Sequence, residues 1–281
     1  MKSQNLIAGV DVSKDTLDVY YNDASGQEHY LKVSNDVKGH ELVLGKLGLQ
    51  RTYLMESSGP YYLKFAFTIR RQDGDVRVAN PIAVKRYIQM HLERNKSDKK
   101  DARWLYFYAK QQQTSAWRLP PKEQLYCAQI MGSIDLYSRQ LVMITNQLHS
   151  LEQLPMQMKE VIKSLQAIKH TVEKEIKKLE KNLELQLLSW QAEKLKSITS
   201  IPGLGKRAVA LLIVYTDGFE KINNHRQLIA LAGLAPREHT SGTSVRGRKG
   251  ICKMGNGHLR NMLYMCSQSP LKLQKRCITC N

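Results

Sequence analysis

Apolar and polar residues alternate along the first 115 residues in a way that predicts short strands followed by helices. Buried strands are expected at the apolar runs 6–12, 17–21, 29–33, 52–55 and 76–79. Segment 35–48 has the spacing of a helix capped by Asn35 or Asp36, segment 63–71 predicts a second helix, and Pro81 stands at the favoured first position of another. This order, two strands joined by a turn and then alternating strands and helices, predicts an α/β domain with a mixed sheet flanked by helices.

From about residue 122 to residue 196 the pattern is purely helical. Apolar residues first repeat at alternating steps of four and three, at Ile130, Ile134, Tyr137, Leu141, Ile144, Leu148 and Leu151. After Pro155, an eleven-residue repeat runs from Val161 to Trp190, which favours nearly straight packing. We therefore expect a long antiparallel helical hairpin. Because a thin hairpin leaves apolar flanks for a partner, we also expect it to contribute to a homo-oligomer.

The remaining residues form a compact, mainly helical and basic region. The predicted domains are therefore residues 1–115, 116–196 and 197–281. The third begins with SITSIPGLGKRAV, which resembles a helix–hairpin–helix turn. Its glycines would let backbone N–H groups approach a phosphate, while Lys206 and Arg207 supply charge. An ordinary glycine-rich connector between helices is the alternative.

The chain is strongly basic, which narrows the choice of partner. Its 43 Lys and Arg oppose 25 Asp and Glu and give a formal net charge of +18. Such a surplus favours a polyanion, since each neutralised phosphate releases condensed counterions. The apolar run before Asp11 is too short for a secretory signal, and no apolar segment approaches the ~20 residues of a membrane helix. The five cysteines suggest no disulfide framework, so a reduced cytoplasm and no membrane partner are expected.

Four acidic residues occupy positions that suit a metal site. Asp11 lies at the end of the first strand, Glu56 follows the strand 52–55, and Asp98 and Asp101 lie three apart at a helix start, on one face. Four gathered carboxylates repel one another, so the arrangement makes sense around divalent cations such as Mg²⁺. Two such ions can activate a nucleophile and stabilise the leaving oxygen of a phosphodiester. The alternative is a solvated helix start with Asp98 as its N-cap, in which the two acids form salt bridges with the cations around them, Lys96, Lys99, Lys100 and Arg103.

The basic segment 237–260 suits close contact with a nucleic-acid backbone. Small and hydroxyl residues alternate there with cations, and the residues expected to bind nucleic acid are Arg237, Arg246, Arg248, Lys249, Lys253 and Arg260. Serine is a weak nucleophile unless a base or a metal activates it, and the segment contains no triad. From the residues alone, Ser241 is a phosphate-contacting loop residue.

Three motifs resemble one known family. The runs GVDVSKDTLDV, ESSG and NKSDKKDA look like the RuvC-like DEDD domain of the IS110 insertion-sequence transposases, relatives of the pilin-gene invertases. The resemblance implies an RNase-H-like fold with Asp11, Glu56, Asp98 and Asp101 as catalytic metal ligands, holding two Mg²⁺ ions. The nearby acids Asp15 and Asp18 are interpreted as structural.

The C-terminal run AGLAPREHTSGTS…GRKGICKMGNGHLRNMLY resembles the transposase domain of the same family. The resemblance implies that Ser241 is the nucleophile that attaches covalently to DNA, with Ser244 as the alternative, and that the four acids complete the site, from the same or another protomer. It further implies donor and target DNA, a structured guide RNA encoded by the element, a dimer or tetramer, and a prokaryotic cytoplasm.

Two other functions fit parts of this pattern. A structure-selective nuclease of the junction-resolvase kind needs the four acids but not Ser241, and a non-catalytic nucleic-acid-binding remnant of a transposase needs neither. Family members continue with helical sequence where this chain stops after QSPLKLQKRCITCN, which bears on its activity. Cys277 and Cys280 could supply half of a zinc site with Cys266 and His258.

Overall fold

The computed structural model describes residues 6–93, 95, 97–220, 222–237, 240–241, 245–246 and 250–278, without the side chains of 240–241, 245–246 and 269–278. The chain folds into two compact units, Met1–Leu119 and Pro120–Asn281. Each unit has hydrophobic clusters of its own. Within the described residues, no helix is both long and apolar enough to cross a bilayer.

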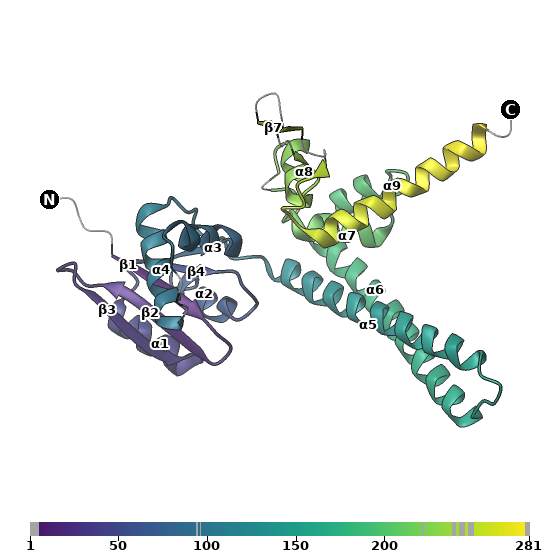
Figure 1. Ribbon diagram of the computed structural model, residues 1–281, viewed down its shortest axis with the longest axis horizontal. Coiled ribbons are helices and arrows are strands. Elements are labelled where there is room, and N and C mark those ends of the chain that lie inside the picture. Colours follow the sequence, from purple (N-terminus) through teal and green to yellow (C-terminus); the bar gives the residue numbers. More distant parts are fainter. Residues whose placement is uncertain are drawn as a thin grey trace. The chain divides into compact units, whose positions relative to one another are not determined.

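The first unit is built on a five-stranded sheet with the order β3-β2-β1-β4-β5 (Figure 1). Its strands are β1 (Ile7–Val12), β2 (Thr16–Asn22), β3 (Glu28–Ser34), β4 (Thr52–Glu56) and β5 (Asp75–Ala79). Strands β1 to β3 form an antiparallel meander, whereas β4 and β5 run parallel to β1. A meander continued by parallel strands on the far side of β1 is the RNase-H-like arrangement, and it confirms the expected fold.

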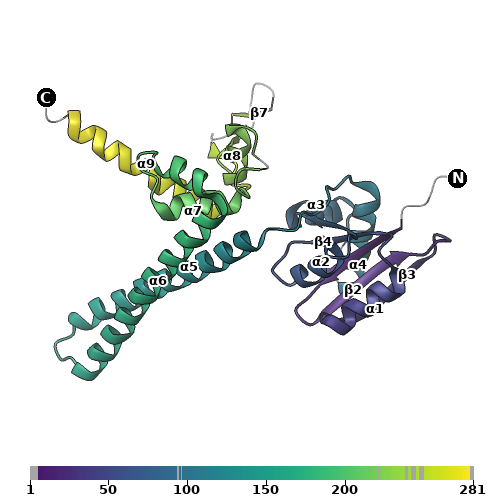
Figure 2. The same cartoon turned by 180° about the vertical axis from the view of Figure 1, so that it is seen from behind.

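Helices cover both faces of this sheet (Figures 1 and 2). They are α1 (Val37–Leu47), α2 (Tyr62–Arg70), α3 (Pro81–Met90) and α4 (Asp98–Gln111). Ala8 and Val10 of β1 pack in the cluster that contains α1 and α2, whereas Ile7 packs in the cluster that contains α4. Because side chains alternate along a strand, the residues of β1 with odd numbers, Asp11 among them, face α4.

Polar caps set where these helices begin. Asp36 caps α1 by accepting from the N–H of Gly39, so the second of the two predicted cap residues is the one used. Ser97 caps α4 and accepts from the N–H of Lys100. Asp98 is therefore the first residue of the helix, and its predicted alternative role as N-cap is wrong.

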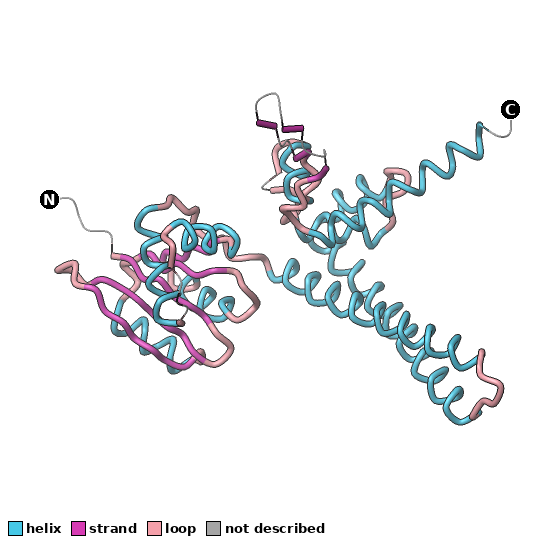
Figure 3. The backbone as a smooth tube through the Cα atoms, viewed as in Figure 1, coloured by secondary structure: helices cyan, strands magenta, loops and turns pink. Residues whose placement is uncertain are grey.

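The second unit is almost entirely helical, as Figure 3 shows in cyan. Its helices are α5 (Lys122–Glu152), α6 (Lys159–Thr199), α7 (Lys206–Tyr215), α8 (His225–Ala232) and α9 (Gly257–Ile278). Helices α5 and α6 form the predicted antiparallel hairpin, with Pro155 in the turn between them. Two short antiparallel pairs complete the unit, β6 (Pro236–Arg237) with β9 (Gly250–Ile251) and β7 (Thr240–Ser241) with β8 (Val245–Arg246).

The hairpin and the C-terminal helices share one core, so the chain divides differently from the three predicted domains. Cys127 of α5, Leu187 of α6 and Leu211 of α7 belong to the same buried cluster. Helix α6 also continues to Thr199, across the predicted boundary between residues 196 and 197, with a break in its backbone at Gln191 (φ −142°, ψ 49°).

Candidate active site

Charged side chains form a row across the face of the sheet that α4 covers. Asp11 of β1 pairs directly with Asp18 of β2, and Asp18 pairs with Lys32 of β3. On the other side of β1, Asp11 and Glu56 lie one step beyond the last registered pair of β1 and β4. Because paired residues of neighbouring strands point to the same face, the four side chains follow one another across the sheet.

A glycine brings the helical acids to this row. A Cβ atom placed on Gly9 would lie 2.3 Å from the carbonyl oxygen of Ala102 and 2.2 Å from the backbone nitrogen of Tyr106. The backbone of α4 therefore rests directly on the backbone of β1, with no side chain between them. This contact lies two residues before Asp11, so the first turn of α4, which carries Asp98 and Asp101, extends toward the end of the strand.

All four predicted acids line one cavity. It has a volume of about 620 Å³ and lies between the strand ends, α3 and α4. Its lining includes Asp11, Glu56, Asp98, Asp101, Ser58 and Lys85. The structure thus brings together carboxylates that are up to 90 residues apart in sequence (101 − 11), as the motif spacing predicted.

The electrostatics of the cavity act most strongly on Asp11. Burial raises the pKa of Asp11 to about 6, and the negative charges of Asp101, Asp98, Glu56 and Asp18 add to the rise. The carboxylates are therefore close enough to repel one another. Such a group of acids is unfavourable unless cations compensate it.

Asp18 is a fifth acid that the sequence interpretation set aside. It is 1% exposed, and the Tyr30 hydroxyl donates to one of its oxygens. The ammonium group of Lys32 lies 3.4 Å from the carboxylate of Asp18 and 3.6 Å from that of Asp98. Lys32 therefore links the buried acid to the cavity. The signal was present in the sequence, because a tight β1–β2 turn at residues 13–15 places Asp18 opposite Asp11.

Comparison with known proteins assigns the chain to a family. A transposase profile of the DEDD IS110 type matches residues 8–156, more than half of the chain, and the profile of the "Transposase IS116/IS110/IS902 family" matches residues 195–278. This chain belongs to the IS110 family of transposases. The resemblance noted in its motifs is confirmed, and so is its class, an enzyme of DNA recombination.

Two relatives are pilin gene-inverting proteins, from Moraxella lacunata and Moraxella bovis. They are 25% and 24% identical to this transposase, over 92% of its chain and 80% of theirs. The solved structure of T. thermophilus RuvC in complex with a Holliday junction substrate aligns with 41% of this chain and 100% of that chain, at 14% identity and a TM-score of 0.32. The fold assignment rests on the strand order and on the family match.

A DEDD transposase domain implies a divalent metal, and the donor set of this cavity fits one. Four carboxylates offer the oxygen ligands that Mg²⁺ prefers. Within the described ranges, however, no three His, Cys, Asp or Glu side chains are grouped closely enough to hold an ion. Asp98, whose side chain is 63% exposed, is directed to Lys32 instead. Mutual repulsion is the physical reason for carboxylates to spread in this way.

The predicted nucleophile of the transposase lies in the second unit. Ser241 is the last residue of β7, and its backbone pairs with that of Val245 in β8. Its side chain, and residue 244 with the alternative nucleophile, lie outside the described part of the structure. The backbone of Ser241 thus belongs to a short β-hairpin instead of the loop that the sequence predicted.

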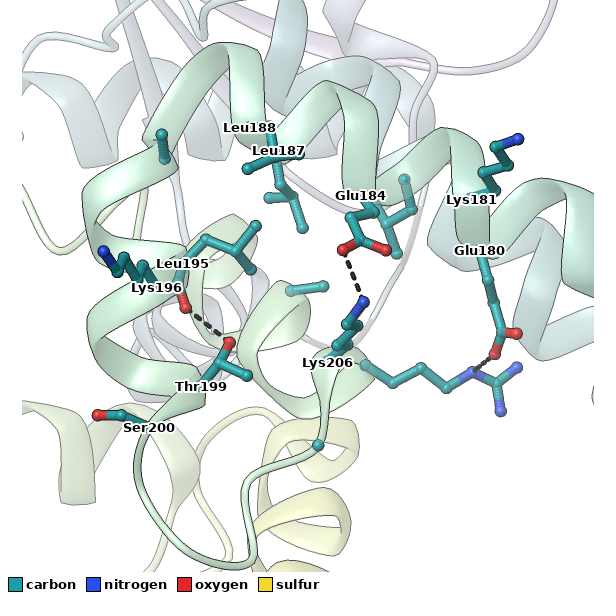
Figure 4. A pocket seen from close by; sticks show the side chains of 15 residues that line it. Glu180, Lys181, Glu184, Leu187, Leu188, Leu195, Lys196, Thr199, Ser200 and Lys206 are labelled. Atoms are coloured by element: carbon teal, nitrogen blue, oxygen red, sulfur yellow. Dashed lines mark hydrogen bonds and ion pairs between the residues drawn. The ribbon is translucent and has the colours of Figure 1, made fainter.

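Lys206 and Arg207 were predicted to contact phosphates, but both are paired within the protein. The Lys206 ammonium lies 2.6 Å from the carboxylate of Glu184, and the Arg207 guanidinium lies 2.9 Å from that of Glu180. Figure 4 shows Lys206 directed at Glu184 beside a groove of about 1030 Å³ between α6 and α7. In this structure the two cations attach the start of α7 to α6.

The other predicted basic residues divide into three groups. Arg237 and Lys253 are exposed on the surface of the second unit. Arg260 donates to the carbonyl oxygen of Ala232 at the end of α8, over a distance of 3.0 Å, which is a structural contact. The backbone of Arg246 is described in β8, whereas residues 248 and 249 lie outside the described residues.

The proposed cysteine-based metal site lies partly outside the described residues. The side chains of residues 277 and 280 lie outside them. His258 has another partner, since its Nδ1 lies 3.2 Å from the carboxylate of Asp135.

Proposed function

We propose that this transposase cuts and rejoins DNA with a serine nucleophile and a divalent metal, Mg²⁺, held by Asp11, Glu56, Asp98 and Asp101. One observation carries the proposal: four acids that are distant in sequence line a single cavity at the ends of neighbouring strands. When bound, the metal supplies positive charge to the reacting phosphodiester. Burial and the neighbouring carboxylates raise the pKa of Asp11, and the positive charge of a bound metal would stabilise its ionised form.

The residues of the chain then divide the work. The sheet holds Asp11 and Glu56 in place, because the residues that precede them in β1 and β4 are buried. Lys32, which also pairs with the buried Asp18, holds the Asp98 carboxylate toward β3, so a metal bound by Asp98 would compete with this ion pair. The approach of α4 at Gly9 sets the distance of Asp101 from Asp11.

Ser241 is the nucleophile of the proposed reaction. Its Oγ forms a bond to phosphorus while the bond from phosphorus to one deoxyribose oxygen breaks, the serine proton is lost to solvent, and the leaving oxygen takes up a proton. A protein–DNA phosphodiester results. Attack by a DNA hydroxyl on this intermediate reverses the bond exchange, rejoins the DNA and frees the serine. The family match over residues 195–278 supports this role, since it includes Ser241.

The proposed partners are donor and target DNA, a structured guide RNA encoded by the element, and further copies of the chain. The net charge of +18 supports polyanionic partners in general. Exposed apolar residues on the hairpin, Val142, Met143 and Ile168 among them, support contact with another copy.

The test is a plasmid that carries the coding element with its natural flanks, in cells that express the transposase. Excision is measured by amplification across the joined flanks, and covalent protein–DNA adducts are measured after denaturation. The intact protein is expected to give both products. Asp11→Asn and Ser241→Ala are expected to give neither, with Ser244→Ala as the matched control that retains both.

Excision that survives Ser241→Ala would remove this serine from the mechanism. Cleavage without rejoining or adduct in that variant, still lost in Asp11→Asn, would instead identify a nuclease of the junction-resolvase kind. DNA binding by the intact protein with no excision, cleavage or adduct would identify a non-catalytic remnant. Sequencing the RNA that copurifies tests the guide: one defined RNA from the element supports it, and mixed cellular RNA contradicts it.

A further inference from the structure

One flank of α4 carries a row of three cations that runs from its first turn to its last. Lys99, Arg103 and Lys110 are exposed and lie four and seven residues apart, so they share one face of the helix. At a rise of 1.5 Å per residue the row is about 16 Å long. One strand of B-DNA presents about five phosphates over that length, because it carries one charge per 3.4 Å.

Each of these cations lies over an aromatic ring. The Lys99 ammonium is 5.1 Å from the centre of the Tyr30 ring, and the Lys110 ammonium is 5.8 Å from that of Tyr106. The Arg103 guanidinium is 5.2 Å from the centre of the Phe107 ring. An aromatic face directs a cation without neutralising it, since the attraction comes from the ring quadrupole and not from a negative charge.

Among the described residues, none of the three cations forms an ion pair with an acid; the Tyr20 hydroxyl lies between Arg103 and Glu28. Among the residues that the structure describes, neighbouring cations are paired, Lys100 with Glu93 at 3.0 Å and Lys32 with Asp18 and Asp98. In that same set of residues, Lys99, Arg103 and Lys110 have no carboxylate within 4.0 Å of their charged nitrogens. A protein surface that keeps three aligned cations free of counterions is suited to a partner that brings its own negative charges.

Helix stability does not account for the row. Lys99 is the second residue of α4, where the positive end of the helix dipole disfavours a cation, and only Lys110 lies in the last turn, where a cation is favoured. The row also begins beside the acidic cavity: Asp98 lines the cavity and is adjacent to Lys99 in the chain, and it contacts Lys32 from β3.

We infer that Lys99, Arg103 and Lys110 form a binding surface for the phosphate backbone of the DNA whose neighbouring segment enters the acidic cavity. The inference rests on the proposed function for its occupant, since the DNA bound here is the DNA that the acids act on. The surface positions this DNA, and its contacts are to phosphates, so it contributes affinity without sequence preference.

The experiment measures binding of a fluorescent duplex DNA of arbitrary sequence to the full-length protein by anisotropy. The buffer contains EDTA, so that no cleavage occurs, and salt is varied between about 50 and 200 mM. A triple variant, Lys99→Gln, Arg103→Gln and Lys110→Gln, keeps long polar side chains and removes three charges. The slope of log affinity against log salt is expected to become shallower by about 0.9 for each cation removed.

The matched control removes three exposed lysines from the opposite face of the sheet, with Lys38→Gln, Lys46→Gln and Lys64→Gln in α1 and α2. It has the same change in net charge and is expected to leave the slope much closer to that of the intact protein. Equal changes of slope in the two triple variants would overturn the inference. If the α4 triple variant does not fold, as judged by circular dichroism, the three single variants replace it, each expected to change the slope by about one.

Further measurements separate the occupant and the proposed function. A structured RNA probe that loses slope in the α4 triple variant while duplex DNA does not would overturn the assignment to DNA. Because binding in EDTA requires no chemistry, a failure of excision with the slope change intact would sink the proposed reaction and leave the surface standing. Normal excision with no slope change would do the reverse.

Discussion

The two units of the chain differ in whether their clustered charges have partners of opposite sign. In the first unit, Asp11 is surrounded by four other acids, and its pKa is raised to about 6 by burial and by their repulsion. In the second unit, Lys206 and Arg207 begin α7, and each is matched by a glutamate of α6 within 3 Å. One cluster is electrostatically unfavourable as it stands, whereas the other is satisfied within the protein.

This difference distinguishes two kinds of charged cluster: one that a bound ligand would stabilise, and one whose charges are already paired within the protein. An exposed ion pair contributes little to stability, and both of its members have already found partners. A buried group of like charges lowers the stability of the fold, and it is retained where a cation or a substrate compensates it. The charge of a motif alone does not distinguish the two cases. The identity of the nearest opposite charge does.

The largest expected effect comes from removing one acid of the cavity. Asp101→Asn keeps the size of the side chain and removes one of the proposed metal ligands, so excision is expected to fall by about a thousandfold or more, equivalent to roughly 4 kcal/mol of transition-state stabilisation. Quantitative amplification of the excision product measures it. The control is Glu175→Gln, which makes the same acid-to-amide change on the exposed hairpin. Comparable losses in both variants would contradict the distinction between the units.

The next effect comes from the contact that positions the acids. Gly9→Ala places a Cβ atom within 2.3 Å of two backbone atoms of α4, so the helix must move and the protein is expected to lose about 1–3 kcal/mol in its free energy of unfolding. Gly45→Ala is the matched control, because a Cβ there meets nothing within 4 Å and alanine favours the helix. Urea denaturation compares them. Equal stability of the two variants would show that α4 does not rest on β1 as described.

The raised pKa of Asp11 predicts a pH-dependent effect on stability. Because the folded protein holds this proton more tightly than the unfolded chain does, the stability that this carboxyl contributes falls as pH rises from about 4 to about 6 and stays low above that. Asp11→Asn in EDTA is therefore expected to be more stable than the intact protein at pH 8, by about 1–2 kcal/mol after allowance for solvent screening, and equally stable at pH 4.

Urea denaturation at the two pH values measures this difference. Glu175→Gln makes the same acid-to-amide change at a half-buried position on the hairpin and serves as the control. A gain in stability that is the same at both pH values would show that titration of Asp11 is not its cause.

The smallest effect concerns the satisfied cluster. Glu184→Gln removes the partner of Lys206, and unfolding is expected to change by less than about 0.5 kcal/mol, because the pair is exposed. The released ammonium is free to meet a phosphate, so binding of duplex DNA should become a few times tighter at low salt. Anisotropy measures it, with Glu160→Gln at the far end of α6 as the control. Unchanged binding would mean that Lys206 serves the fold alone.

The acidic cavity could be predicted from the sequence because strands and helix starts leave local signals. The alternation of apolar and polar residues predicted that Asp11 and Glu56 lie at strand ends. The helical period predicted that Asp98 and Asp101 share one face. The order of the strands in the sheet could not be predicted from alternation, because an apolar run does not specify which strand it pairs with. Only the family resemblance, through the RNase-H-like fold, implied this order. Asp18 was missed because it was judged alone, without the hairpin register that pairs it with Asp11.

The ion pairs of the cations could not be predicted in the same way, because they join helices whose relative rotation leaves no local signal. The partners of Lys206 and Arg207 lie 22 and 27 residues earlier, on a helix whose rotation depends on tertiary packing. The same limit applies to Lys99, because the Tyr30 ring under its ammonium group belongs to β3. The break of α6 at Gln191 gave no local signal either, since no proline or glycine marks it.

Because Gly9 has no side chain, the distance between β1 and α4 at this point is set by their two backbones alone. Elsewhere in the unit, leucine, valine and phenylalanine side chains separate the sheet from its helices, and substitution of these residues changes the volume between the layers. At Gly9 no side chain lies between β1, which carries Asp11, and α4, which carries Asp98 and Asp101. The distance between β1 and α4 at this point is therefore set by their backbones, and it does not depend on which side chains fill the neighbouring clusters.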